Sequence, residues 1–179
     1  GCKANKYEAD SMTDKLRSAG AFICDNGDIA DIYIVNTCSV TNVAEKKSRQ
    51  MLRRAKKKNK DAIVVAAGCY VNASHEELEA MDDIDLIIGN NCKKDIVEVL
   101  EQYFTNRDNS NHYIDINCTD EYEEMGKLQI SSLDHRRAYI KIQDGCNQFC
   151  SYCLIPYTRG RVRSRQPEKI LSEILSLAR

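Results

Sequence analysis

The chain has 179 residues, of which 42% are apolar and 30% are charged, and its formal net charge is −1. This length fits one domain or two small ones, and the apolar fraction excludes global disorder. A net charge near zero gives no support by itself for a nucleic-acid partner, and the longest uncharged apolar run, 62–67, is far shorter than the roughly 20 residues of a membrane span.

Helix and strand signals alternate along the first part of the chain. Helices are predicted over 5–19, 44–59, 74–81 and 95–104, and strands over 32–36, 62–67 and 86–88. Gly20 is expected to stop the first helix, and Ser74 to cap the third because Glu77 follows three residues later. Strands that alternate with helices favour a parallel α/β sheet.

The pattern breaks in the polar stretch that begins at Thr105. We therefore divide the chain into a first domain, 1–107, a linker, 108–134, and a second unit, 135–179. The second unit is expected to contain a strand over 138–143, a cysteine-rich loop and a helix over 167–178. One such unit cannot bury its own apolar face, so we expect the second domain to be truncated, and Gly1-Cys2 indicates a fragment whose first strand is missing.

The number of cysteines, nine, is odd, so they cannot all form disulfides within the chain. Nothing at the N-terminus reads as a secretory signal, so we expect a cytoplasmic protein with no membrane partner. In a reducing cytosol, such cysteines bind metals or carry out redox chemistry more often than they form disulfides.

Three cysteines lie close together at Cys146, Cys150 and Cys153. Zinc sites usually take four ligands from paired sets, and no fourth Cys or His follows Cys153. Three thiolates on one loop instead suit three irons of a [4Fe-4S] cluster, whose fourth iron stays open for a small molecule. Zinc binding and simple packing of the thiols are the alternatives.

Three further cysteines are dispersed at Cys2, Cys38 and Cys69, and the latter two each follow a predicted strand. Because the carboxyl ends of parallel strands share one edge of a sheet, these two could converge there, with Cys2 if a strand preceded it. The alternative is that all three are small buried residues. For Cys24, Cys92 and Cys118, packing is the expected role.

Several motifs together resemble the radical S-adenosylmethionine methylthiotransferases. The resemblance rests on the three clustered cysteines, the run 155–168, and the segments 1–8 and 36–42. It covers nearly the whole chain. Lys3, the Ser39-Val-Thr-Asn42 run and Lys47-Ser-Arg49 look most like the bacterial branch that acts on threonylcarbamoyladenosine in tRNA, and the isopentenyladenosine branch is next most similar.

The resemblance implies a fold, two cofactor sites and a reaction. It implies an N-terminal methylthiotransferase domain followed by the start of a radical S-adenosylmethionine (β/α) barrel. Cys146, Cys150 and Cys153 would hold the radical-generating [4Fe-4S] cluster, with Tyr152 near the adenine of S-adenosylmethionine. Cys2, Cys38 and Cys69 would hold an auxiliary [4Fe-4S] cluster that supports sulfur delivery. The reaction would methylthiolate C2 of N6-threonylcarbamoyladenosine at position 37 of tRNA, with a flavodoxin- or ferredoxin-type electron donor and a sulfur donor.

Basic residues fit a tRNA substrate, because phosphate contacts by Lys and Arg dominate RNA binding. One basic run lies at 45–60, and four alternating arginines follow the cysteine loop at Arg159, Arg161, Arg163 and Arg165. Packing against an acidic face is the alternative for these arginines. Two rival functions stay open for the whole protein, a non-catalytic iron–sulfur or electron-transfer protein and a zinc-stabilised RNA-binding protein.

Overall fold

The computed structural model describes residues 1–25, 27–106, 121–122, 124–125 and 138–178. Its sheet contains β1 (Ile32–Thr37), β2 (Ile63–Gly68) and β3 (Leu86–Ile88), which run parallel in the order β1-β2-β3. The parallel α/β arrangement expected from the alternating signals is therefore confirmed. The start of a barrel is not seen in the described residues.

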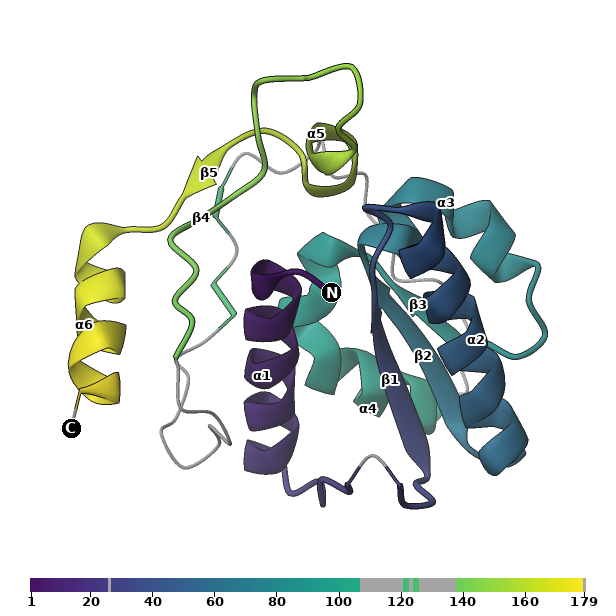
Figure 1. Cartoon of the computed structure of the whole chain (residues 1–179). Helices are drawn as coiled ribbons and strands as arrows, with labels where there is room; N and C mark the ends of the chain where they lie inside the picture. Colours follow the sequence, from purple (N-terminus) through teal and green to yellow (C-terminus); the bar gives the residue numbers. More distant parts are fainter. Residues whose placement is uncertain (26, 107–120, 123, 126–137, 179) are drawn as a thin grey trace.

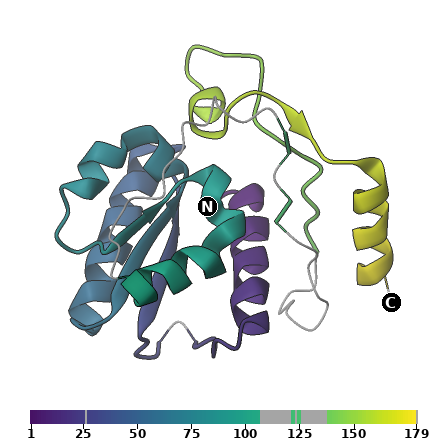
Figure 2. The same ribbon diagram turned by 180° about the vertical axis from the view of Figure 1, so that it is seen from behind.

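Helices cover both faces of this sheet (Figures 1 and 2). The helices α1 (Lys3–Ser18) and α4 (Ile96–Asn106) lie on one face, and α2 (Asn42–Lys58) and α3 (Cys69–Glu79) lie on the other. Val65 packs in the first core and Val64 in the second, because successive side chains of a strand point to opposite faces.

The expected helices and strands of 1–106 form with small shifts in their ends, except at α3. This helix begins at Cys69, directly after β2, and not at Ser74. Ser74 has a non-helical backbone, with φ −155° and ψ 54°, and breaks α3 into two parts. The helix predicted to begin after Ser74 therefore corresponds to the second part of α3, and the first part, from Cys69, was not expected. A short 3-10 helix, η1 (Asn90–Asp95), connects β3 to α4.

The C-terminal part contains a two-stranded antiparallel pair, β4 (Gln143–Asp144) with β5 (Arg163–Ser164), and two helices, α5 (Ile155–Arg159) and α6 (Pro167–Leu177). The strand predicted over 138–143 is wrong apart from its last residue, Gln143, which pairs with Ser164 of β5. Ile142 before it only accepts a backbone hydrogen bond from Arg165 at 2.9 Å. The α6 helix is confirmed, with Pro167 in its first turn. Most of the predicted linker 108–134 and Cys118 lie outside the described residues.

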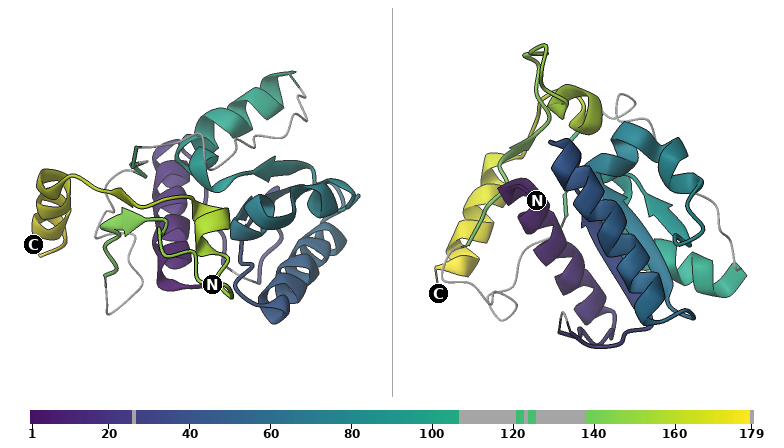
Figure 3. Two further views of the ribbon diagram at one scale, coloured as in Figure 1. Left: turned by 90° about the horizontal axis from the view of Figure 1, so that it is seen from above. Right: turned by 45° about the vertical axis from the view of Figure 1, so that its right-hand side comes forward.

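The C-terminal part contributes to the same core as α1 and α4. Met125 is buried in that core, and Tyr139 and Leu177 pack against it. The loop before α5 and α5 itself lie over the end of the sheet where the parallel strands finish, as Figure 1 and the view from above in Figure 3 show. Within the described part of the chain, no helix combines the length and the apolar character needed to cross a bilayer.

Candidate metal centre at the carboxyl end of the sheet

The three dispersed cysteines all lie at the carboxyl edge of the sheet. Thr37 of β1 is in register with Gly68 of β2, so Cys38 and Cys69 leave neighbouring strands at the same level. Cys2 caps the N-terminus of α1. The Asn5 side-chain amide ties this helix end to β1, because it donates hydrogen bonds to the carbonyls of Asn36 and Thr37 at 3.1 and 3.0 Å.

Each of the three cysteines has a polar neighbour. The Asn5 backbone N–H donates to Cys2 Sγ at 3.4 Å, and the Asn90 side-chain amide donates to Cys69 Sγ at 3.6 Å. The Cys38 backbone N–H donates to Ser48 Oγ at 3.2 Å. Cys2 is exposed, Cys38 is half-buried and Cys69 is buried, so the three residues differ in their access to solvent.

Gly68 allows the close approach of β1 and β2 at this edge. Its φ of +106° lies in the left-handed region, and a Cβ there would be 2.6 Å from the Thr37 carbonyl oxygen. Cys69 follows directly as the first residue of α3. The turn at Gly68 therefore sets the direction in which the chain leaves β2 and carries Cys69.

The sulfur atoms themselves are not gathered into a ligand set. Among the residues that the structure describes, no three Cys, His, Asp or Glu side chains are close enough to hold a metal ion. Both cysteine sets therefore remain predictions as metal ligands. The donor chemistry fits iron nevertheless, since none of the eight described cysteines forms a disulfide, and thiolates are the usual ligands of iron–sulfur clusters.

Buried polar atoms without a hydrogen-bond partner collect at the same edge. Within the described residues, they include Asn36 Oδ1, Ser39 Oγ, Asn72 Nδ2, Asn90 Oδ1 and Arg159 Nε. A buried polar atom left unpaired costs about 1–3 kcal/mol, so such a set indicates a place that a bound group or water would complete.

The clustered cysteines occupy the loop between β4 and α5. The Cys153 N–H donates to the Cys150 carbonyl at 2.9 Å, and the Cys146 N–H donates to the Gly160 carbonyl at 3.0 Å. Cys150 is exposed, while Cys146 and Cys153 are half-buried. Tyr152 is 89% exposed, so its ring is open to a ligand.

A buried arginine connects this loop to α1. Arg159, the last residue of α5, donates to both Glu8 carboxylate oxygens at 2.6 and 3.1 Å, and to Asp144 at 3.0 Å. Lys93 and Lys141 also pair with Glu8, at 2.6 and 2.7 Å. We call these five residues the Glu8–Arg159 cluster. Two carboxylates face three cations, which leaves one positive charge in excess.

The cluster favours the charged forms of Glu8 and Arg159. Burial disfavours the Glu8 carboxylate, but Lys93, Arg159 and Lys141 outweigh this effect and hold the Glu8 pKa well below its ordinary value. Burial opposes the charge of Arg159 as well, yet Glu8 and then Cys69 raise the Arg159 pKa. Burial lowers the Lys93 pKa, and Glu8 and Cys69 act against it. Cys69 therefore lies within the field of two buried cations.

Asn90 forms a second connection between the cysteine sites. Its side-chain amide donates to Cys69 Sγ and also to the Thr158 carbonyl, at 2.7 Å. Thr158 precedes Arg159 in α5, which packs against α3. The end of the cysteine loop is thus fixed next to the buried Cys69.

The arginines after the loop do not form the expected exposed row. Arg159, Arg163 and Arg165 are buried, and only Arg161 is exposed. Arg163 donates to the Arg159 carbonyl, and Arg165 pairs with Glu124 and Glu173. Packing against acidic groups, the alternative, therefore describes Arg159 and Arg165 in this structure, and the assignment of the four arginines to RNA phosphates stays a prediction.

Several residues of this region escaped the sequence analysis, namely Asn5, Glu8, Asn90 and Lys93. One signal was available, since Asn5, Glu8 and Met12 follow the spacing of a buried helical stripe, and a carboxylate on such a stripe requires buried cations. Nothing local distinguishes Lys93 or Asn90, because their partners are distant in sequence.

Comparison with known proteins gives a consistent match. Residues 1–89 match the family described as "Uncharacterized protein family UPF0004". The chain is 37% identical to the threonylcarbamoyladenosine tRNA methylthiotransferase MtaB of Bacillus subtilis, over 99% of this chain and 39% of that protein, and 36% identical to the enzyme of that name from Aquifex aeolicus, over 99% and 43%. It is 34% identical to the tRNA-2-methylthio-N(6)-dimethylallyladenosine synthase of Protochlamydia amoebophila, over 97% and 38%. The chain thus spans about two fifths of these relatives.

Proposed function

The chain belongs to the methylthiotransferase family that carries the UPF0004 domain, and on that premise we propose that it is part of an enzyme that adds a methylthio group to tRNA. The relatives that match it over nearly its whole length are named for this reaction on two different tRNA nucleosides.

One structural observation supports this proposal above the others. Cys38 and Cys69 leave adjacent, registered strands, and Asn5 ties the helix end that carries Cys2 to β1. The backbone positions of three cysteines that are distant in sequence thereby lie at the edge of the sheet where ligands bind in open α/β folds. The excess positive charge of the Glu8–Arg159 cluster suits an anionic group at Cys69.

We assign the two cysteine sets to two [4Fe-4S] clusters. Cys146, Cys150 and Cys153 would hold the cluster that binds S-adenosylmethionine, with Tyr152 beside the adenine, and Cys2, Cys38 and Cys69 would hold the auxiliary cluster. Together these cofactors supply one-electron cleavage of S-adenosylmethionine and support delivery of sulfur.

The residues of the chain have supporting roles in this chemistry. Arg159 and Lys93 place positive charge beside Cys69, and Asn90 donates a hydrogen bond to its sulfur. Hydrogen bonds to cluster sulfurs and nearby charge are the means by which proteins tune such sites. The exposed Tyr152 and Cys150 leave the loop open to small molecules, whereas the buried Cys69 is shielded from water.

We propose N6-threonylcarbamoyladenosine at position 37 of tRNA, methylthiolated at C2, as the substrate. The support is the similarity to the MtaB enzymes together with the Lys3 and Lys47-Ser-Arg49 segments. N6-isopentenyladenosine at the same position is the alternative, supported by the similarity to the dimethylallyladenosine synthase. We expect the reaction in the cytoplasm, with a flavodoxin- or ferredoxin-type electron donor and a separate sulfur donor.

The decisive experiment uses the full-length protein, reconstituted without oxygen. It is incubated with dithionite, sulfide as the sulfur source, S-adenosylmethionine and tRNA carrying either modified adenosine, and the nucleosides are analysed by mass spectrometry. We expect 5′-deoxyadenosine and 2-methylthio-threonylcarbamoyladenosine. Product only from the isopentenyladenosine tRNA would select the alternative substrate.

The rival functions give different results in the same preparation. Iron and sulfide without any 5′-deoxyadenosine would favour a non-catalytic iron–sulfur protein, in the manner of an electron carrier. Zinc without iron or sulfide would favour a zinc-stabilised RNA-binding protein. Either result would contradict the proposed function.

A further inference from the structure

The outer face of α2 is the most strongly basic helical surface in the described part of the chain. This helix contains eight Lys or Arg residues and a single acid, Glu45 in its first turn. Ser48, Leu52 and Ala55 face the sheet and are buried. The exposed cations are therefore confined to the opposite side.

The basic residues of α2 fall into two groups. Four of the eight have partners within the chain: Arg49 pairs with Glu77, Arg53 with Asp83 at 3.8 Å and Lys56 with Asp85 at 2.8 Å, and Lys58 donates to the Gly27 and Asp28 carbonyls. Within the described residues, Lys46, Lys47, Arg54 and Lys57 are exposed and make no ion pair. We call these four residues the α2 basic face. Charges used for structural pairing are thus separate from charges left facing solvent.

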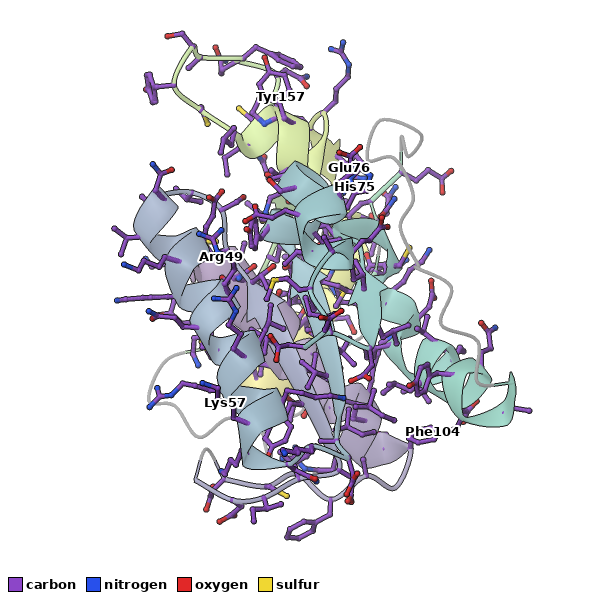
Figure 4. The ribbon with its side chains drawn as sticks, turned by 90° about the vertical axis from the view of Figure 1, so that its right-hand side faces the viewer. Arg49, Lys57, His75, Glu76, Phe104 and Tyr157 are labelled. Atoms are coloured by element: carbon purple, nitrogen blue, oxygen red, sulfur yellow. The ribbon has the colours of Figure 1, made fainter. Side chains whose placement is uncertain are left out.

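The α2 basic face is long enough to contact several phosphates of a nucleic acid, and it extends away from the candidate metal centre. The eleven-residue step from Lys46 to Lys57 corresponds to about 17 Å along a helix. The N-terminal end of the α2 basic face lies near the carboxyl edge of the sheet, because Ser48 Oγ accepts a hydrogen bond from the Cys38 backbone N–H at 3.2 Å. Figure 4 shows Arg49 toward the end of the molecule that carries Tyr157, and Lys57 toward the other end. The α2 basic face therefore leads away from the candidate metal centre.

The composition of the face favours a nucleic acid over a protein partner. Lysine is depleted in protein–protein interfaces, which use aromatic residues and Arg, whereas Lys and Arg supply most contacts to phosphates. The helix itself has a single acid, Glu45, and the neighbouring Asp83 pairs with Arg53, so the charges of the four exposed cations add along the helix and would attract a continuous polyanion.

We propose that the α2 basic face binds the phosphate backbone of the RNA whose nucleoside reaches the carboxyl edge of the sheet. This inference rests on the proposed function, because it takes the partner to be tRNA. It assigns to the UPF0004 domain a part in holding the substrate, through contacts that do not depend on base sequence.

The test compares two double variants of the full-length, cluster-loaded protein. Arg54→Gln with Lys57→Gln removes two charges of the α2 basic face at its far end from the cysteines. Arg17→Gln with Lys169→Gln is the control, because it removes the same charge from two exposed residues that each pair with an acid elsewhere. Binding of substrate tRNA is measured by fluorescence anisotropy over a range of salt concentrations.

We expect the α2 double variant to bind tRNA about tenfold more weakly near 0.1 M salt. The slope of log affinity against log salt concentration is negative, and its magnitude should decrease by about 1.5, the value for two lost phosphate contacts. The control double should change neither quantity appreciably. Thermal melting verifies that both variants stay folded.

Other outcomes would overturn the inference in distinguishable ways. Unchanged affinity and slope in the α2 double variant would contradict it and would leave the face to an acidic protein partner. Equal weakening in both doubles would show a general effect of net charge. A wild-type protein that binds no tRNA would instead overturn the proposed function on which the inference rests.

Discussion

At the residue scale, Glu8 is the carboxylate on which the buried charges converge. It is 3% exposed and accepts from Lys93, Lys141 and Arg159, which come from three separate segments. A buried ion pair that loses one partner leaves a charge uncompensated in a medium of low dielectric constant. The main role of Glu8 is therefore to compensate these buried cations, which would lose their counter-charge if Glu8 were removed.

We predict that Glu8→Gln destabilises the chain by about 3–5 kcal/mol, the usual cost of breaking a buried ion pair. Urea unfolding at pH 7 measures the loss. Glu101→Gln is a matched control, because Glu101 is an exposed glutamate on α4. A loss below that of the control would contradict the electrostatic account.

The pH dependence follows from the low Glu8 pKa. The folded pKa lies below the ordinary value of 4.5, so the folded state binds fewer protons and the carboxylate stabilises the fold above about pH 4.5. This stabilisation is lost as the pH falls below 4.5 toward the folded pKa. Between pH 6 and pH 3, the free energy of unfolding measured with urea should decrease less steeply for Glu8→Gln than for wild type. If the free energy of unfolding depended on pH in the same way for both proteins, groups other than Glu8 would be responsible for the acid sensitivity.

Substitutions in the two cysteine sets should affect different steps of the reaction in the full-length enzyme. Cys150→Ala should abolish formation of 5′-deoxyadenosine. Cys69→Ala should retain that cleavage but form no methylthiolated nucleoside, and each variant should bind about half of the wild-type iron. Cys24→Ala is the control, because Cys24 is half-buried in the loop after α1, away from both sets. Normal product from Cys69→Ala would exclude the auxiliary site as assigned.

At the element scale, the turn from β2 into α3 depends on a glycine. Gly68→Ala should destabilise the chain by about 2–3 kcal/mol, because alanine meets both a left-handed φ and the Thr37 carbonyl oxygen at 2.6 Å. Gly20→Ala should cost about 1 kcal/mol, since Gly20 shares the positive φ but has open space around it. Gly27→Ala, which meets neither obstacle, should be close to neutral. Thermal melting compares the three, and equal effects would contradict this order.

The same turn shows what local sequence patterns can and cannot predict. The β-branched run before Gly68 and the apolar spacing of α4 were sufficient to predict those elements. The start of α3 was not predicted, because a glycine in a left-handed conformation can lead directly into a helix, and Ser74-x-x-Glu77 gives the same signal at a kink as at a helix start.

At the scale of the whole molecule, the Glu8–Arg159 cluster and Asn90 hold the cysteine loop against the sheet. Arg159→Gln should therefore loosen the loop and α5 while the sheet stays intact. Hydrogen–deuterium exchange should accelerate over 146–160 and remain unchanged in β2. Arg161→Gln is the control, because Arg161 is an exposed arginine of the same segment. Uniform acceleration in both regions would indicate global destabilisation instead.

The long-range part of the site could not be read from the sequence for a physical reason. The positions of Cys38 and Cys69 were predictable, since the parallel sheet brings strand ends to one edge. The burial of Arg159 and Arg165 was not, because alternating arginines look the same whether they face solvent or distant carboxylates such as Glu8 and Glu173. Only the folded chain shows which of the charges are neutralised.

The separation of 151 residues between Glu8 and Arg159 has a consequence for biosynthesis. A ribosome that adds about 5–20 residues per second delivers the arginine roughly 8–30 s after the glutamate. During that interval the nascent sheet edge carries its thiols without the segment that later covers them. Cys69 would thus be accessible to a metal that binds the growing chain, and the segment with Arg159 would cover it only after its synthesis.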